Sequence, residues 1–208
     1  MQRFITLAFN TLLLLSLNAA TPETHYTVIV SLDGFRWDYP DMYKTPNLDR
    51  MAADGVKAVM LPSYPASTFP NHYTLATGLV PDHHGIINNT FWDVKNRRQY
   101  SMGDSATRNN PEYYLGEPIW ITAQKQGVKT GNMYWVGSDI AIKKSHPTYY
   151  RPWNAKPFLT FEQRIDTVLT WLQKPEPERP RLIMLYFESP TEAGITTARA
   201  VCLPVRWS

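Results

Sequence analysis

The sequence predicts an α/β fold in which a mostly parallel sheet is flanked by helices. Two observations lead to this class: apolar, strand-like runs alternate with helix-like segments along the chain, and Gly or Pro residues stand at the boundaries of these segments. The length of 208 residues and the 43% hydrophobic content suit one globular domain, or one and a half, with a sizeable core. In such folds, functional sites gather beyond the carboxyl ends of the strands.

The first half of the chain contains two strand-like and two helix-like segments. The run 26–33 is rich in β-branched residues and typical of a buried parallel strand, and a second strand is expected over 56–61. A helix is expected over 46–54, because Thr45 can cap it, Pro46 suits its first turn and Gly55 ends it. The next helix, 69–77, follows Thr68 directly.

The second half repeats the alternation. We expect a helix over 118–126 that ends at Gly127, a strand over 129–135, a helix over 161–172 and a strand over 181–187. A Pro-rich hinge separates the last two segments.

Composition excludes several classes of protein. The 19% charged residues do not suit a disordered polyelectrolyte, and the net charge of +3 comes without a basic run, so no nucleic-acid groove is indicated. The single cysteine, Cys202, excludes an internal disulfide framework.

The first twenty residues have the pattern of a secretory signal peptide. A single Arg3 precedes an apolar stretch that runs to Leu17, and the small residues Ala19 and Ala20 suit cleavage. Polar residues interrupt the stretch, which is short for a span of roughly 30 Å of hydrocarbon. An uncleaved membrane anchor is the alternative, and in both cases we expect the mature part to be exported, to the periplasm or the extracellular space.

Asp33 places a carboxylate at the carboxyl end of the first predicted strand, with Gly34 next to it. A metal ion or another cationic partner would explain a carboxylate in that position. The alternative is a helix cap or a turn residue.

Thr68 directly precedes a predicted helix that has Pro70 in its first turn. An anion at this helix end would gain from free N–H groups and the helix dipole, so the Thr68 hydroxyl could act as a nucleophile toward a phosphoryl group. The alternative is a plain N-cap. A threonine hydroxyl needs activation, which a divalent metal such as zinc, held by carboxylates and imidazoles, would supply.

The other polar and aromatic candidates are weaker. We expect His83 and His84 to be structural or exposed, His72 to be a helix-face residue, and Asn89 to be a candidate donor to a developing oxyanion. Aromatic side chains could form a ligand pocket, against a nucleobase or a choline group, or fill the core; they are Phe91, Trp92, Tyr134 and Trp135.

Five segments, read in order, resemble the type I phosphodiesterase/nucleotide pyrophosphatase family of the alkaline phosphatase superfamily. They are Ser31-Leu-Asp-Gly-Phe-Arg-Trp-Asp38, Thr45-Pro-Asn-Leu, Ser67-Thr-Phe-Pro-Asn-His-Tyr-Thr-Leu-Ala-Thr-Gly78, His84-Gly-Ile-Ile-Asn-Asn89 and Trp135-Val-Gly-Ser-Asp139. The resemblance implies two zinc ions in the complete family, with Asp33 as a zinc ligand and Thr68 as the metal-bound nucleophile that becomes phosphorylated. It also implies that Asn89 and the N–H of Phe69 contact the oxyanion. The expected substrate contacts are Phe69, Asn89 and Tyr134.

The implied reaction is hydrolysis of phosphodiester or pyrophosphate bonds in nucleotides, or, as in some members, in lysophospholipids or choline phosphodiesters. The expected partner is therefore a small nucleotide or another phosphodiester. A sulfatase-like or phosphonate-cleaving hydrolase is a weaker alternative, because a sulfatase would need Cys or Ser in a different local pattern at Thr68.

The sequence departs from the family after its last predicted strand. The family continues with Pro-Asp-x-x-Gly-His-x-x-Gly-Pro, but Thr191 stands at the Asp position and Ile195 at the His position. An Asp-His pair and a last His, which the family supplies further on, do not follow. Two protein ligands, Asp33 and Thr68, are fewer than the three or four that hold zinc tightly.

A one-base frameshift directly after Gly194 would explain this tail, because the shifted frame can encode the family's Gly-His-x-x-Gly-Pro. We therefore expect residues 1–20 to be a signal peptide, 21–194 the N-terminal part of the catalytic domain and 195–208 a tail unrelated to the family. The alternative to an active hydrolase is a truncated, catalytically inactive remnant.

Overall fold

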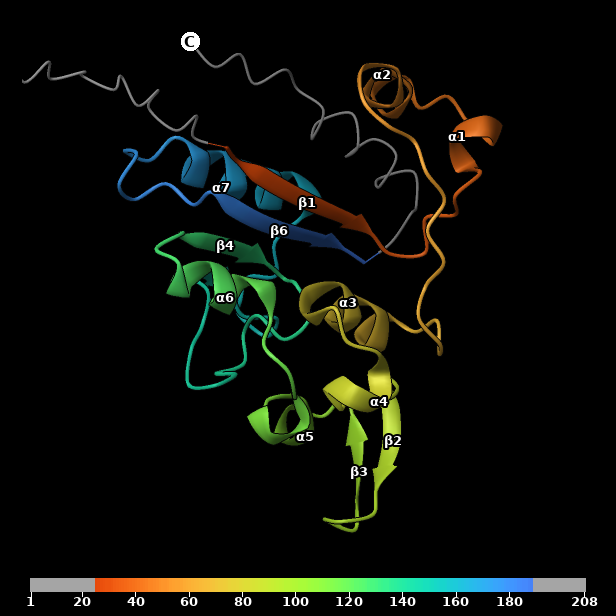
Figure 1. Ribbon diagram of the computed structural model, residues 1–208, viewed down its shortest axis with the longest axis vertical. Helices are drawn as coiled ribbons and strands as arrows, with labels where there is room; N and C mark the ends of the chain where they lie inside the picture. The colour runs from red at the N-terminus through yellow and green to blue at the C-terminus, as the bar shows by residue number, and fades with distance from the viewer. Residues whose placement is uncertain (1–24, 189–208) are drawn as a thin grey trace, which may run out of the picture.

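The computed structural model describes residues 25–188, which contain a four-stranded sheet in the order β1-β6-β4-β5 (Figure 1). Its strands are Thr27–Leu32 (β1), Thr130–Met133 (β4), Tyr149–Arg151 (β5) and Leu182–Phe187 (β6), and every neighbouring pair is parallel. The predicted α/β class with a parallel sheet is confirmed. The carboxyl ends of β1 and β6 lie next to each other, because Leu32 pairs with Phe187.

Strand β6 forms the centre of the core. All six of its residues are buried, as expected for a parallel strand that is covered on both faces. In Figure 1, α6 (Ile119–Lys125) lies next to β4, α7 (Phe161–Leu172) lies behind β1 and β6, and α3 (Thr68–Thr77) lies below the carboxyl ends of the strands. Burial of apolar side chains on both faces of the sheet therefore holds β6 in place, and β6 leads into the candidate site.

Helix α7 approaches the sheet closely. A capping box starts the helix, in which the Thr160 hydroxyl accepts from the N–H of Gln163 and the Gln163 side chain accepts from the N–H of Thr160. Further along the helix, Trp171 lies so close to Gly131 of β4 that a Cβ atom added to this glycine would be 2.8 Å from the indole ring. A glycine is required there because nothing larger fits between helix and sheet.

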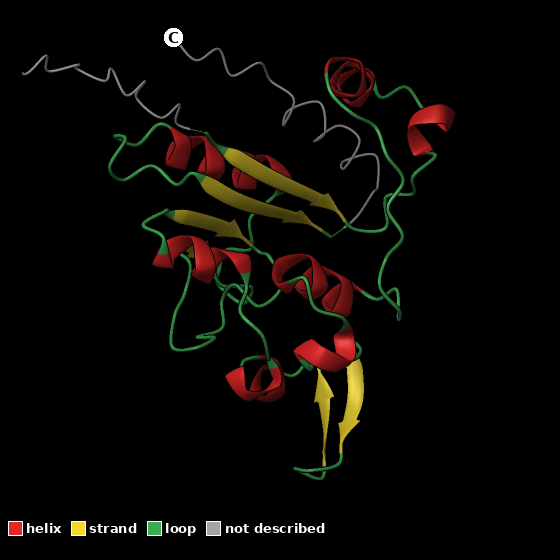
Figure 2. Cartoon of the chain, in the orientation of Figure 1, coloured by secondary structure: helices red, strands yellow, loops and turns green. Residues whose placement is uncertain are grey.

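The remaining elements extend from this core on two sides (Figure 2). Helices α1 (Tyr39–Met42) and α2 (Pro46–Asp54) follow β1, while α4 (Pro81–His84), α5 (Ser105–Arg108) and the 3₁₀ helix η1 (Pro111–Tyr113) lie beyond α3. A two-stranded antiparallel hairpin is formed by β2 (Thr90–Asp93) and β3 (Arg98–Ser101). The predicted helices are confirmed as α2, α3, α6 and α7, and three predicted strands as β1, β4 and β6, with ends that differ by up to two residues.

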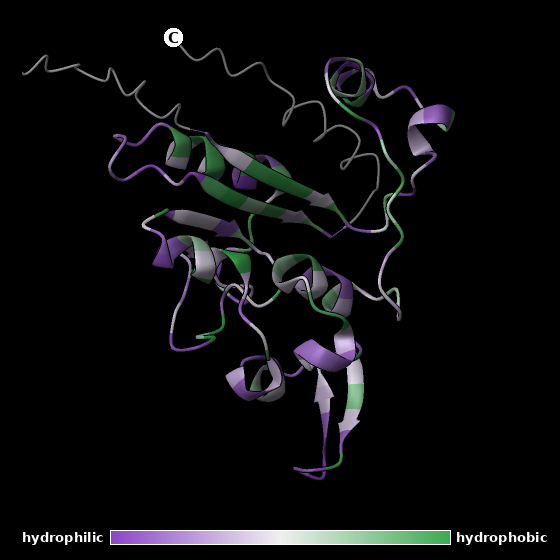
Figure 3. Cartoon of the chain, viewed as in Figure 1, coloured by the Kyte–Doolittle hydropathy of each residue, from purple (hydrophilic) through white to green (hydrophobic). Residues whose placement is uncertain are grey.

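The strand predicted over 56–61 is wrong. These residues form no strand, and Val56 and Leu61 are 91% and 89% exposed. An apolar run becomes a strand only beside a hydrogen-bonding neighbour, and in the described residues the outer edge of β1 pairs with no strand. Figure 3 shows hydrophobic residues along this open segment, which joins α2 to α3.

The predicted signal peptide and the tail from residue 189 onward, including Thr191, Gly194 and Ile195, lie outside the described residues. Within residues 25–188, no helix has the length and apolar character needed to cross a membrane.

Candidate active site

Asp33 is fixed at the junction of β1 and β6. Its N–H donates to the carbonyl of Phe187 at 2.9 Å, which extends the strand pairing by one residue. Its carboxylate oxygen Oδ2 accepts two hydrogen bonds of 2.9 Å, one from the hydroxyl of Thr68 and one from the phenol of Tyr186. Asp33 stands in the turn that follows β1, where the N–H of Phe35 donates to the carbonyl of Leu32 at 3.1 Å, so the turn interpretation is confirmed for its backbone. Its carboxylate caps no helix and is bonded instead to residues from distant parts of the chain.

Thr68 is the first residue of α3, and its hydroxyl turns away from the helix. The cap position belongs to Ser67, which makes no side-chain capping bond, so the plain N-cap interpretation of Thr68 is wrong. The Thr68 hydroxyl donates to Asp33 instead. The helix N-terminus thus presents a hydroxyl that is oriented by a carboxylate, at a position whose dipole favours an anion.

His72 lies one helical turn after Thr68 and contacts its backbone carbonyl. Its Nδ1 is 2.7 Å from the Thr68 carbonyl oxygen and its Nε2 is 2.8 Å from the Ser31 hydroxyl, so the ring joins α3 to β1. The side chain is buried, and burial lowers its pKa against the opposing effects of the Thr68 carbonyl and the charge of Asp33. His72 lies on a face of α3 and holds the backbone of the helix start.

Phe69 and Asn89 are also brought together. The N–H of Phe69 donates to Oδ1 of Asn89 at 2.9 Å, while Nδ2 of Asn89 makes no hydrogen bond within residues 25–188. The contact orients the Asn89 amide next to Thr68 and leaves its NH₂ group for a ligand. The N–H of Phe69 would have to leave Asn89 before it could contact an oxyanion, and the oxyanion role of this pair stays a prediction.

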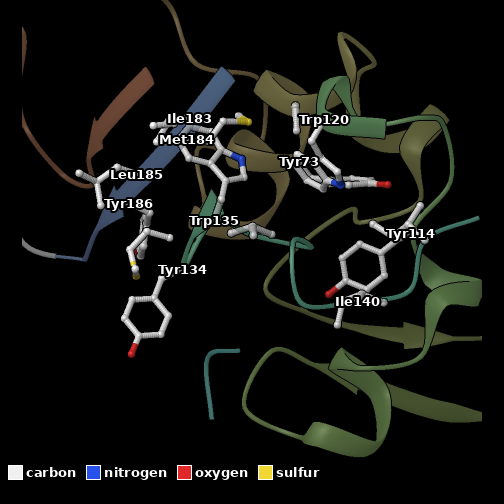
Figure 4. Close-up of a cluster of buried hydrophobic side chains, with 14 of the residues drawn as sticks. Tyr73, Tyr114, Trp120, Tyr134, Trp135, Ile140, Ile183, Met184, Leu185 and Tyr186 are labelled. Carbon is white, nitrogen blue, oxygen red and sulfur yellow. The ribbon is translucent and has the colours of Figure 1, made fainter. Parts of the chain in front are cut away.

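A cavity of about 250 Å³ adjoins Thr68 and Asp33. Its lining includes Phe69, Tyr134 and Trp153, together with the buried Trp135. Figure 4 shows Tyr134, Trp135 and Tyr186 among the buried side chains around β6 and the loop that follows β4. Aromatic walls beside a hydroxyl suit the binding of a flat or apolar group.

Tyr134 forms a rigid part of this wall. Its backbone has a φ of +57°, in the left-handed region, and its ring stacks on Phe158 at 4.9 Å. Its hydroxyl accepts from the N–H of Leu159 at 3.2 Å. The hydroxyl accepts this bond and keeps its own proton to donate, while the Arg164 guanidinium lies 4.6 Å from the centre of the ring.

Charged side chains complete the lining. Arg108, which is 8% exposed, and Asp139 both border the cavity, and Asp139 accepts from the N–H of Trp153 at 3.0 Å. Glu188 also borders it and is held by the fully buried Arg164, whose Nη2 donates to Oε1 at 2.9 Å. These bonds fix the loops that carry Asp139 and Trp153, and the end of β6, at the cavity.

Sequence reasoning missed several of these residues, namely Arg108, Trp153, Tyr186 and Glu188. Glu188 carried a visible signal, since it follows an apolar strand as Asp33 does. The strand before Asp33, β1, is half-buried or exposed and not buried as its sequence predicts, because it has a neighbour on one edge alone within residues 25–188. Tyr186 carried none, because all six residues of β6 are buried and the strand shows no alternation. Burial and the nearby Asp33 carboxylate raise the pKa of Tyr186, so its hydroxyl keeps the proton that it donates.

The remaining candidates lie elsewhere. His84 is fully buried and contacts the Thr74 hydroxyl at 3.0 Å, and His83 is exposed, which confirms the structural and surface roles expected for them. Phe91 and Trp92 do not line the cavity. They belong to the β2–β3 hairpin, where Phe91 stacks on Tyr100 and Trp92 is 61% exposed.

The donor set at Asp33 and Thr68 is small for a zinc centre. Asp33 and Thr68 supply two neighbouring oxygen atoms, and residues 25–188 contain no group of three His, Cys, Asp or Glu side chains that could hold a metal ion. Tight zinc sites use three or four protein ligands. The described residues therefore do not fit a zinc centre by themselves.

Comparison with known proteins adds independent information. The family model for type I phosphodiesterase / nucleotide pyrophosphatase matches residues 27–195. The chain belongs to this family. Ectonucleotide pyrophosphatase/phosphodiesterase family member 3 from Bos taurus is 42% identical over 170 residues, which are 80% of this chain and 19% of that protein. Venom phosphodiesterase 2 from Crotalus adamanteus is 40% identical over 170 residues, 80% of this chain and 21% of that protein.

A solved structure of the phosphodiesterase family gives the same fold. It is the murine ectonucleotide pyrophosphatase/phosphodiesterase 5, as an inactive variant in complex with AMP, with a TM-score of 0.72 and 34% identity. The match covers 82% of this chain and 45% of that one. The chain thus spans about a fifth of the length of the curated relatives and less than half of this solved member of the family.

Proposed function

We propose that the chain hydrolyses phosphodiester or pyrophosphate bonds in nucleotides through Thr68. The observation that carries the proposal is the Thr68 hydroxyl at the start of α3, 2.9 Å from the Asp33 carboxylate and facing a cavity with aromatic walls. Family membership supports the same reaction class.

In the proposed reaction, the Thr68 oxygen forms a bond to phosphorus as the bond to the leaving oxygen breaks. Asp33 orients the hydroxyl before attack, and the positive end of α3 favours the negative charge that gathers on the phosphoryl oxygens. The Thr68 hydroxyl gives up its proton to solvent as it attacks, and the leaving group departs as an alcohol or a phosphate after it takes a proton from solvent. Water then cleaves the phosphothreonyl intermediate and restores the Thr68 hydroxyl.

The proposed substrate class is a nucleotide. Phe69, Tyr134 and Trp153 offer ring surfaces in the cavity, and a solved relative is a complex with AMP. We also propose zinc dependence, in which Asp33 and Thr68 supply two ligands and the others come from outside residues 25–188. This rests on family resemblance and on the need of a threonine hydroxyl for activation, and the proposal of export rests on the pattern of residues 1–20. Relatives named as ectonucleotide and venom enzymes support an exported location.

Residues 21–194 are proposed to form the N-terminal part of the catalytic domain, with 195–208 outside it because of a frameshift after Gly194. The family match, which ends at residue 195, supports this boundary. Resequencing the gene tests it. A correct reading frame beyond Gly194 that still lacks the family's Asp-His residues would contradict it.

The decisive test of function is hydrolysis of a chromogenic nucleotide phosphodiester by the purified chain, with and without added zinc. The Thr68→Ala variant is measured beside it. We expect zinc-dependent turnover that falls by about 1,000-fold in the variant, because the nucleophile is lost. Turnover that is equal in both proteins would overturn the role of Thr68.

A second candidate is a chain with the family fold and no turnover of its own. The observation in its favour is the incomplete donor set, in which two oxygen ligands stand without a third within the described residues. Zinc content after dialysis separates the two candidates, since an assembled site retains metal and an incomplete one does not. Retained zinc together with Thr68-dependent turnover would exclude the inactive chain.

A further inference from the structure

Tyr186 connects the nucleophile to the centre of the sheet. It lies in β6, opposite Ser31 of β1, and its side chain is 4% exposed. Its hydroxyl donates to Oδ2 of Asp33, the same atom that accepts from Thr68, and both distances are 2.9 Å. Three segments that are far apart in the sequence therefore meet at one carboxylate oxygen.

The Asp33 carboxylate needs an external partner to hold one orientation. Rotation about the bond that carries an aspartate carboxylate is soft and roughly two-fold, so either oxygen could face Thr68. The Tyr186 hydroxyl removes this freedom, because it occupies one acceptor direction of Oδ2 and leaves another for Thr68. Oδ1 makes no hydrogen bond within residues 25–188.

The Tyr186 ring is itself held rigidly. It packs edge-on against His72 at 4.9 Å, and the backbone carbonyl of His72 accepts from the indole N–H of Trp135 at 3.1 Å. His72 in turn contacts the carbonyl of Thr68. The Tyr186 ring and the backbone of Thr68 are thus both held by contacts with His72.

We propose that Tyr186 is a positioning residue, whose hydroxyl fixes the Asp33 carboxylate so that Oδ2 orients the Thr68 hydroxyl. It acts through Asp33 and does not touch the reacting atoms. The inference rests on the proposed role of Thr68, and its test includes a measurement that requires no turnover.

The first measurement is a double-mutant cycle in thermal unfolding with Tyr186→Phe, Thr68→Val and the double variant. Tyr186→Phe is expected to lower the unfolding midpoint by about 3–6 °C, because it removes a hydrogen bond to a charged group. If Tyr186 orients Asp33 for Thr68, then Thr68→Val costs clearly less in the Tyr186→Phe variant than in the parent chain, since its hydrogen bond is already weakened. Additive shifts would overturn the proposal.

Tyr149→Phe is the matched control. The Tyr149 hydroxyl donates to the carbonyl of Glu178 at 2.9 Å, and Tyr149 does not line the cavity. The same chemical change at Tyr149 is expected to be additive with Thr68→Val. If the unfolding shift of Thr68→Val changed equally in the Tyr186→Phe and Tyr149→Phe variants, the coupling would not be specific to Tyr186 and the proposal would be overturned.

The second measurement separates positioning from simple stabilisation. In hydrolysis of the chromogenic diester, Tyr186→Phe is expected to lower kcat by about tenfold and leave KM unchanged, because it misaligns the nucleophile and leaves the aromatic walls in place. Unchanged kcat in a folded variant would overturn the proposal. If the parent chain shows no turnover, the function proposal fails and the unfolding cycle alone decides the role of Tyr186.

Discussion

Two regions on either side of β1 differ sharply in how they use apolar residues. On the side of β6, Ile183, Met184 and Phe187 are fully buried, and the Tyr186 hydroxyl between them donates to Asp33. On the other side, residues 37–64 expose Trp37, Val56 and Leu61 by 60% or more. Apolar composition alone therefore does not create a core, because a strand must also find a neighbour to pair with.

Hydrogen exchange is expected to show the largest difference between the two regions. The amides of Ile183 and Leu185 lie inside the ladder between β1, β6 and β4, and should exchange only through large-scale opening. The amides of 56–61 belong to no strand or helix. We expect slower exchange in β6 by at least about 1,000-fold, measured by NMR or mass spectrometry. Comparable protection of 56–61 would show that this segment is paired in solution.

Truncation of one apolar side chain in each region sharpens the comparison. Ile183→Ala removes a fully buried side chain and is expected to cost about 4 kcal/mol of unfolding free energy, measured in urea. Leu61→Ala is the control, with an expected change within about 0.5 kcal/mol, since Leu61 is 89% exposed. Equal losses would contradict the division into a packed and an open region.

Two ion pairs extend the comparison to charges. Arg164→Leu leaves Glu188 and two backbone carbonyls without their buried partner, and we expect a loss of about 3 kcal/mol. Lys57→Met breaks the exposed pair with Asp41 and should change stability by less than about 0.5 kcal/mol. Urea unfolding of both variants checks this, and a loss for Lys57→Met as large as that for Arg164→Leu would refute it.

The smallest expected effect is a loss of stability in mild acid. Burial lowers the pKa of His84, so the folded chain binds fewer protons than the unfolded chain once the pH falls below the ordinary histidine pKa of about 6.5. Unfolding free energy should therefore decrease between pH 7 and pH 5. His84→Gln should show a smaller decrease, measured by urea unfolding at both pH values. An identical decrease in both proteins would assign the effect to other groups.

The sequence predicted those parts of the fold that local patterns determine. A β-branched run identified β1, and apolar segments that alternate with helices identified β4 and β6. A cap residue and a Gly stop identified α2, and apolar residues at helical spacing identified α7. Asp33 and Thr68 could be singled out because each stands at the end of an element. Tyr186 and Trp153 could not, since their roles depend on contacts with residues far away in the chain. The failed strand at 56–61 has the same cause, because pairing is a non-local property.

Gly131 does not line the cavity, yet it influences the shape of the cavity. The missing side chain lets Trp171 of α7 rest on β4, and the same helix carries Arg164, which grips Glu188 at the cavity. A methyl group at position 131 would push the indole outward, and the helix would carry its guanidinium along with it. The absence of a side chain at Gly131 thus determines the position of one wall of the cavity, although Gly131 does not line it.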